Sequence, residues 1–276
     1  MHGRSNKGYW PLWVPLSISV FTLVGIPVAL ALFQPVLSGG ASDAFDFLLI
    51  TNAEKAFVHG VSYAVVTAAL QLVVGVGAAL ALWLGKRGTN ALATLFMLPY
   101  FVPTISVVLI LTLFFDPRSG FFTMLGMSID TSVLFTSNGI FALVVIASVW
   151  QFFPFIFLAV YSKLRTIPSS QVEAITLDGA GLWHIFKYVA WPHLIYVIQA
   201  VLILRLLWMF TKFDTVYLIA GNSLLRDQVE TVPVLAYRLA FQQGMLTAST
   251  LLCIAMFVLL IAVPFIVSKA TQEVSR

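Results

Sequence analysis

Residues 167–194 read IPSSQVEAITLDGAGLWHIFKYVAWPHL. In the second half of the chain, this is the longest segment with interspersed polar residues between two apolar blocks. Pro168 ends any helix that precedes it, because proline lacks the backbone N–H that a helix interior uses. Ser170 and Glu173 have the spacing of a capping box, which predicts that a new helix begins here. We expect this helix to run to about Asp178.

The second half of this stretch predicts a turn and another short helix. The sequence DGAG at residues 178–181 is typical of a turn, since glycine adopts backbone conformations that other residues avoid. Apolar side chains then recur at helical spacing until Pro192, which we expect to end the helix. These apolar positions are Leu182, Ile185, Phe186 and Val189. The stretch is therefore predicted to be a loop of two short helices between two apolar spans.

The composition of the 276-residue chain is that of a polytopic membrane protein. Hydrophobic residues make up 60% of it and charged residues 9%, and its mean hydropathy is +0.99, whereas soluble domains are roughly 25% charged. Six apolar blocks are long enough to cross a bilayer, and the first is too long for a cleavable secretory signal. We therefore predict an all-α fold with six transmembrane helices in one domain over residues 1–276. The blocks lie at about residues 12–33, 60–84, 91–115, 139–162, 194–220 and 246–268.

The distribution of basic residues predicts the orientation of these spans. If both termini are cytoplasmic, nine Lys and Arg residues lie on the cytoplasmic side and five on the other, with Arg205 inside the membrane. An excess of basic residues marks cytoplasmic loops. This orientation also places the 163–193 loop in the cytoplasm. The net charge of +4 thus expresses topology and gives no reason to expect nucleic acid as a partner.

The sequence contains none of the common signatures of catalysis or metal binding. Cys253 is the single cysteine, so neither an intrachain disulfide nor a thiolate cluster is possible, and the four histidines lack ligand spacing. Gly85-Lys86 is the nearest approach to a phosphate loop, but Leu80 stands where the first glycine is needed and Arg87 follows. We predict no catalytic residue, no metal and no cofactor in this chain. A membrane-embedded enzyme is an alternative without support from a motif.

Arg205 is the informative charge within the membrane. It stands near the middle of the fifth apolar block, where an arginine costs roughly 2.5 to 3.5 kcal/mol and should face a cavity or a partner. Trp208 and Lys212 follow at i+3 and i+7, on the same face if one helix carries all three. Such a face could donate hydrogen bonds to hydroxyls and stack on a sugar ring. Alternatively, Arg205 bonds a helix carbonyl, Trp208 packs on a neighbour, and Lys212 extends to the membrane surface.

The 167–194 stretch resembles the cytoplasmic "EAA" loop of permease subunits in bacterial ATP-binding-cassette (ABC) importers. The family pattern is Glu-Ala-Ala, three residues, Gly, nine residues, Ile-x-Leu-Pro; Ile175, Val189 and Trp191 depart from it and the spacing is intact. In that family the loop rests in a groove on the ATPase subunit and couples it to the spans. The resemblance gives this coupling role to Glu173, Ala174, Asp178, Gly179, Ala180 and Pro192. The residues alone also allow Glu173 to be a helix cap and Asp178 a turn former.

Three further segments resemble the first permease subunit of carbohydrate importers of the maltose and glycerol-phosphate type. They are SVWQFFPF at 148–155, RLLWMFTKFDTVYLIAG at 205–221 and TVPVLAYRLAFQQG at 231–244, and the likeness extends from about Gly60 to the end of the chain. Ala220-Gly221-Asn222-Ser223 departs from the Thr-Gly-Gly-Gly-Pro run of that family. The resemblance places the lining of the substrate pathway at Ser148, Phe152, Phe155, Arg205, Trp208, Met209 and Lys212.

The resemblance implies the permease fold of a type I ABC importer in the bacterial cytoplasmic membrane. A second homologous permease, two ATPase subunits that hold ATP and Mg²⁺, and an extracytoplasmic solute-binding protein would complete the assembly around a small-molecule substrate and membrane lipid. Two alternatives stay open. One is the same architecture with a non-carbohydrate solute, such as a polyamine, an amino acid or a phosphate ester. The other is an ATP-independent channel, transporter or membrane enzyme.

Overall fold

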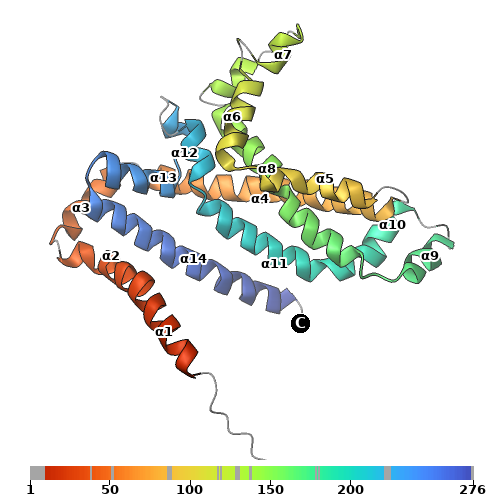
Figure 1. Cartoon of the computed structure of the whole chain (residues 1–276), viewed down its shortest axis with the longest axis horizontal. Coiled ribbons are helices and arrows are strands. Elements are labelled where there is room, and N and C mark those ends of the chain that lie inside the picture. Colours follow the sequence, from red (N-terminus) through yellow and green to blue (C-terminus); the bar gives the residue numbers. More distant parts are fainter. Residues whose placement is uncertain are drawn as a thin grey trace, which may run out of the picture. The chain divides into compact units, whose positions relative to one another are not determined.

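The computed structural model describes residues 10–37, 39–50, 53–85, 89–116, 118, 120–127, 131–136, 139–177, 179, 181–220 and 225–274. All regular elements in these ranges are helical (Figure 1). The α-helices are α1 (Trp10–Val20), α2 (Ile26–Leu37), α3 (Ala41–Ile50), α4 (Ala53–Leu84), α5 (Thr89–Phe101), α6 (Thr104–Phe114), α7 (Phe121–Met124), α8 (Ile140–Leu164), α9 (Ser169–Leu177), α10 (Leu182–Ile185), α11 (Trp191–Phe210), α12 (Asp214–Ala220), α13 (Val232–Tyr237) and α14 (Leu246–Val274). Shorter helical turns are of the π type at Phe21–Gly25, Phe186–Ala190 and Arg238–Gln242, and of the 3₁₀ type at Thr131–Phe135 and Arg226–Gln228.

Four described helices are long and apolar enough to cross a membrane. A further pair could form one broken span, and the first part of α14 is a shorter apolar segment. Each of the six predicted blocks is therefore mostly helical, and six crossings stay a prediction. The four are Ser17–Pro35, Ala53–Leu84, Ile140–Leu164 and Leu182–Phe210; the pair is Ala91–Phe101 with Thr104–Phe114, and the shorter helix is Leu246–Ala262.

The stretch between the first two predicted blocks, residues 34–59, is largely helical in the part that the structure describes. Helix α3 lies within it and α4 already begins at Ala53. At 1.5 Å per residue, the 32 residues of α4 extend about 48 Å, more than the roughly 30 Å of a bilayer core. The charged first turn of α4 therefore prolongs the span beyond the apolar block that predicted it.

The third predicted span is broken in the middle. Helices α5 and α6 meet at 96° between Phe101 and Thr104. Pro103 begins the second half with an extended backbone (ψ 138°) and has no N–H to continue the first helix. The side-chain amide of Gln151 on α8 donates to the Val102 carbonyl at 2.9 Å and so satisfies an acceptor exposed by the break.

Helix α11 differs from the prediction at both ends. Pro192 does not end the preceding helix, because the π-helical turn at Phe186–Ala190 carries the chain through it with a wider bond from the Trp191 N–H to the Phe186 carbonyl. Such a turn relieves the clash of a proline ring with the preceding carbonyls. The predicted span at 194–220 then stops at Phe210, and α12 begins after a short break.

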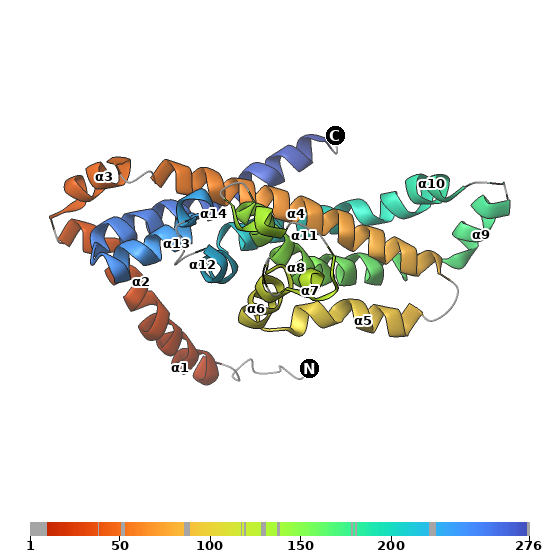
Figure 2. The ribbon, with the colours of Figure 1, turned by 90° about the horizontal axis from the view of Figure 1, so that it is seen from above.

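The chain divides into two compact units, residues 1–53 with 235–259 and residues 54–234 with 260–276. In the first, the Gln34 amide on α2 donates to the Thr247 hydroxyl on α14 at 3.1 Å. In the second, α8 packs against α5, α6, α11 and α12 (Figures 1 and 2). Helix α4 approaches α8 at Gly75, where an added Cβ atom would lie 2.9 Å from the Ile156 side chain. A single domain over 1–276 stays a prediction.

Candidate functional site

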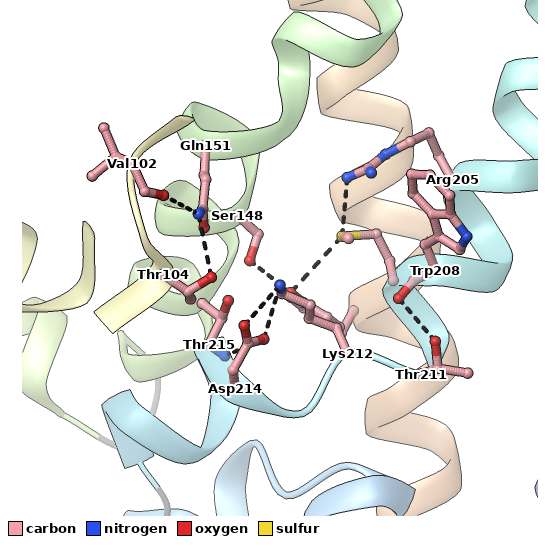
Figure 3. A network of polar contacts seen from close by, with 12 residues as sticks. Val102, Thr104, Ser148, Gln151, Arg205, Trp208, Thr211, Lys212, Asp214 and Thr215 are labelled. Carbon is pink, nitrogen blue, oxygen red and sulfur yellow. Dashed lines mark hydrogen bonds and ion pairs between the residues drawn. The ribbon is translucent and has the colours of Figure 1, made fainter. Parts of the chain in front are cut away.

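A cavity of about 340 Å³ lies in the second unit beside the C-terminal end of α11. Five of the seven predicted lining residues form part of its wall, namely Phe152, Arg205, Trp208, Met209 and Lys212. The wall is completed by Thr211, Phe213 and Asp214. Figure 3 shows Arg205 and Trp208 on one side and Ser148 and Gln151 of α8 on the other.

Arg205 is held among aromatic rings and is only 1% exposed. Its guanidinium carbon lies 5.0, 5.7 and 5.6 Å from the ring centres of Phe152, Phe155 and Trp208, within the range of cation–π attraction. Its Nε atom donates to the side-chain oxygen of Gln71 on α4 at 2.8 Å. Among the described residues, no Asp or Glu forms an ion pair with Arg205. These residues therefore provide no carboxylate to balance the charge of the guanidinium at the cavity.

A buried polar network stands behind Arg205. The Gln71 amide nitrogen donates to the Ser148 carbonyl at 2.9 Å, and the hydroxyls of Ser148 and Tyr63 are 2.6 Å apart. The Met209 sulfur lies 3.6 Å from both the Gln71 amide nitrogen and an Arg205 Nη atom. Side chains of three helices, α4, α8 and α11, thus meet at one polar centre in apolar surroundings.

Two of the predicted lining residues have other positions. Ser148 is fully buried and belongs to the polar network instead of the cavity wall. Phe155 packs against Trp208 with ring centres 5.2 Å apart, so it supports the wall from behind. The predicted helical face shared by Arg205, Trp208 and Lys212 is wrong in its last member, because α11 ends two residues before Lys212.

Lys212 reaches the cavity from the break between α11 and α12. Its Nζ atom lies 2.9 Å from Oδ1 of Asp214 and 4.3 Å from the centre of the Phe152 ring. The Thr211 hydroxyl bonds the Leu207 and Trp208 carbonyls, each at 3.2 Å, where α11 ends. This hydroxyl therefore supplies a hydrogen-bond donor to carbonyls at the end of the helix, next to the cavity.

We did not predict three residues of this site from the sequence, Gln71, Tyr63 and Asp214. Gln71 and Tyr63 lie in the second apolar block. The amide of Gln71 and the phenol of Tyr63 are polar groups in an apolar span, and such groups could have indicated a polar contact. Asp214 stands in the segment that resembles carbohydrate permeases, but its pairing with Lys212 depends on the break in the helix, which the apolar pattern does not indicate.

The second candidate site is the loop around α9. Glu173 and Ala174 are exposed on this helix, while Val172 and Ile175 pack against the core of the second unit. Ser170 lies inside the first turn of α9 and not at its N-cap, where it was predicted. Gly179 follows at φ +76°, a left-handed conformation that favours glycine. Asp178 and Ala180 lie outside the described residues.

The loop presents apolar side chains to its surroundings. Leu177, Leu182 and Trp183 are 88%, 67% and 68% exposed. Pro192 is also exposed, in the first turn of α11. Figure 1 places α9 and α10 together at one end of α8 and α11. Within the described ranges, no group of three or more His, Cys, Asp or Glu side chains could hold a metal ion.

Residues 71–272 match the model of the family described as binding-protein-dependent transport system inner membrane component. The chain belongs to this family. Both candidate sites lie within the matched residues, from Gln71 through the α9 loop to the cavity.

Similar curated proteins of this transport family are permeases. The chain is 31% identical over 182 residues to the inner membrane ABC transporter permease protein YcjO of Escherichia coli K12, which covers 64% of this chain and 60% of that protein. It is 32% identical over 167 residues to the trehalose/maltose transport system permease protein MalF of Thermococcus litoralis, covering 59% and 56%. The matched part spans about three fifths of these relatives' length.

Solved structures of bacterial transporters have the same fold. A bacterial ABC transporter involved in the import of the acidic polysaccharide alginate superposes with a TM-score of 0.76 at 15% identity, over 96% of this chain and all of that one. A crystal structure of the alginate transporter with a periplasmic protein bound to alginate pentasaccharide gives 0.74. The predicted all-α permease fold of an ABC importer is confirmed.

Proposed function

We propose that this chain is the membrane-spanning subunit of an ATP-driven importer and forms half of a translocation pathway for a carbohydrate. The observation that carries this proposal is the cavity at the end of α11, where Arg205 lies beside the rings of Phe152 and Trp208. A guanidinium donates hydrogen bonds to hydroxyls and carboxylates, and aromatic rings stack on apolar faces. A mono- or oligosaccharide, a sugar acid or a polyol phosphate offers such groups.

The names of the relatives support a sugar as the solute. Besides the trehalose/maltose permease, the multiple sugar-binding transport system permease protein MsmF of Streptococcus mutans is 26% identical over 247 residues, covering 85% of this chain and 84% of that protein. These names describe those proteins. They favour a carbohydrate over other solutes for the same architecture.

The α9 loop is proposed to couple the spans to a separate ATPase. Glu173 and Ala174 would lie against the ATPase surface, with Gly179 setting the direction of the chain after the helix. A second homologous permease, two ATPase subunits that bind ATP and Mg²⁺, and an extracytoplasmic solute-binding protein would complete the transporter. In this arrangement both termini face the cytoplasm, and ATP is hydrolysed by the partners.

The charges in the cavity favour neutral or anionic solutes. Its described wall holds two cations, Arg205 and Lys212, against the single carboxylate of Asp214. A polyamine would meet net repulsion there, whereas an amino acid also carries a carboxylate that Arg205 would attract. The non-carbohydrate alternative is therefore weaker for cations, while sugar acids and polyol phosphates remain suited to the site.

The test is solute transport and ATP hydrolysis by the complete transporter in liposomes. The panel contains maltose, trehalose, diacetylchitobiose, alginate oligosaccharides, glycerol 3-phosphate and spermidine, each with the purified binding protein. We expect a sugar or sugar acid to stimulate both activities, Arg205→Ala to change which solute does so, and Glu173→Ala to lower transport per ATP hydrolysed. Stimulation by spermidine alone would contradict the carbohydrate assignment.

A further inference from the structure

Gln71 is a fully buried amide in the middle of the long helix α4. Its sequence neighbours are apolar, and a buried amide without hydrogen bonds would be costly in such surroundings. Both ends of this amide are used, and they join two different helices. The oxygen accepts from Arg205 on α11, and the nitrogen donates to the Ser148 carbonyl on α8.

The orientation of the Gln71 amide follows from the chemistry of its partners. Arginine has only donors and a backbone carbonyl only accepts, so the oxygen must face Arg205 and the nitrogen Ser148. The bond engages Nε, and one Nη group lies against the Met209 sulfur, which leaves the other Nη group of the guanidinium for the cavity. A neutral amide also leaves the positive charge of Arg205 in place, which a carboxylate would neutralise.

A second contact fixes α4 against α8 next to this amide. The Tyr63 hydroxyl bonds the Ser148 hydroxyl, so one residue of α8 is held through its carbonyl by Gln71 and through its side chain by Tyr63. Tyr63 and Gln71 are eight residues apart on α4 and so share one face of this helix. These contacts therefore fix the position of Gln71, and the bond to Gln71 in turn holds the long, flexible side chain of Arg205.

We propose that Gln71 is a positioning residue of the solute pathway, which directs the guanidinium of Arg205 into the cavity and leaves it charged. The proposal rests on the proposed function, because Arg205 must contact the solute for its position to matter. It differs from a purely structural role, in which Gln71 would only join α4 to α8 and α11. The two roles differ in whether the effect of Gln71 on transport passes through Arg205.

A double-mutant cycle on the complete transporter in liposomes tests this distinction. The variants are Gln71→Leu, Arg205→Met and the pair, measured with the panel sugar that the wild type transports fastest. We expect Gln71→Leu to raise KM about tenfold with little change in kcat, as for loss of a bond to a charged group. In the Arg205→Met background the same change should leave KM unaltered. If Arg205→Met gives no measurable transport, the affinity of the transporter for the solute, measured by direct binding, replaces KM in the cycle.

Thr67→Val is the matched control on the same helix. Thr67 lies one turn before Gln71, is equally buried, and its hydroxyl has no hydrogen-bond partner among the described residues. We expect this variant to transport like the wild type. A tenfold rise in KM for Thr67→Val would mean that any change in this part of α4 disturbs the site, which would overturn the positioning role.

A spectroscopic measurement observes the bond without transport. In ¹⁵N-arginine-labelled transporter, the Arg205 Nε–H signal, assigned by its loss in Arg205→Lys, should exchange with solvent faster in Gln71→Leu and be unchanged in Thr67→Val. Equal effects of Gln71→Leu in both Arg205 backgrounds, or an unchanged Nε–H signal, overturn the inference alone. If Arg205→Met leaves KM and solute preference as in the wild type, the proposed role of the cavity fails, and the inference with it.

Discussion

The Nζ atom of Lys212 lies 2.9 Å from Oδ1 of Asp214, and this ion pair joins the break after α11 to the first residue of α12. The same Nζ atom is 4.3 Å from the centre of the Phe152 ring in the cavity wall. The side chain of Lys212 is 17% exposed and that of Asp214 is 42% exposed. The pair is thus open to solvent on one side and connects the helix break with the cavity.

We expect Lys212 to affect solute preference more than stability. A partly exposed ion pair contributes about 1 kcal/mol or less, so Lys212→Met should lower the free energy of unfolding by no more than this. Loss of a cation from the wall should lower transport of alginate oligosaccharides about fivefold relative to maltose, a change of roughly 1 kcal/mol. Competition between the two labelled solutes measures the ratio, with Lys212→Arg as the conservative control. An unchanged transport ratio would show that Lys212 does not contribute to solute preference.

Trp208 should contribute to solute affinity through its ring. It is 42% exposed and lies in the cavity wall beside Arg205. We expect Trp208→Ala to raise KM for the transported sugar about tenfold, since aromatic contacts are worth on the order of 1 kcal/mol beyond the area they bury. Trp150 on α8 is a matched control, because it is 40% exposed and is not part of this wall. Equal losses in Trp150→Ala would indicate a general packing effect.

Gly179 and Gly181 separate backbone strain from side-chain bulk in the coupling loop. An added Cβ atom meets nothing within 4 Å at either position, but Gly179 has φ +76° and Gly181 has φ −77°. Gly179→Ala should therefore strain the loop by about 1 kcal/mol, whereas Gly181→Ala should not. We expect fewer solute molecules transported per ATP hydrolysed in the first variant only. If both variants couple like the wild type, the turn after α9 does not set the position of the coupling helix.

The helices of this protein could be predicted from its sequence, but the breaks in them could not. Long apolar runs determine where helices form in a membrane, whatever lies next to them. Pro103 was visible inside the third block, yet the 96° bend is matched by the Gln151 amide of another helix, a contact that no local pattern contains. The end of α11 before Lys212 was missed for the same reason, because the apolar block continues beyond it.

The candidate site was predictable where a single residue carries the signal. Arg205 was found because a charge in an apolar span is energetically costly and should therefore face a cavity or a partner. Gln71 was missed, since an amide in a span is a weaker signal and its partner lies 134 residues along the chain. Ser148 and Phe155 were placed in the pathway by resemblance, and the structure gives them supporting positions behind the wall.

Close packing of α4 on α8 provides the last prediction. An added Cβ atom at Gly75 would lie 2.9 Å from the Cβ atom of Ile156 and 3.0 Å from the backbone nitrogen of Phe157, so both helices would have to move apart. Overpacking of this kind costs about 1 to 3 kcal/mol. At Gly77, on the same helix, nothing lies within 4 Å of the added atom.

We therefore expect Gly75→Ala to lower the thermal unfolding midpoint of the purified transporter, and Gly77→Ala to leave it unchanged or raise it slightly through the better helix propensity of alanine. Because α4 also carries Tyr63 and Gln71, a displaced α4 should weaken the hold on Arg205 as well. Gly75→Ala should then raise KM together with the loss of stability, whereas Gly77→Ala should change neither. A stable Gly75→Ala variant with wild-type KM would show that α4 and α8 do not approach each other at this point.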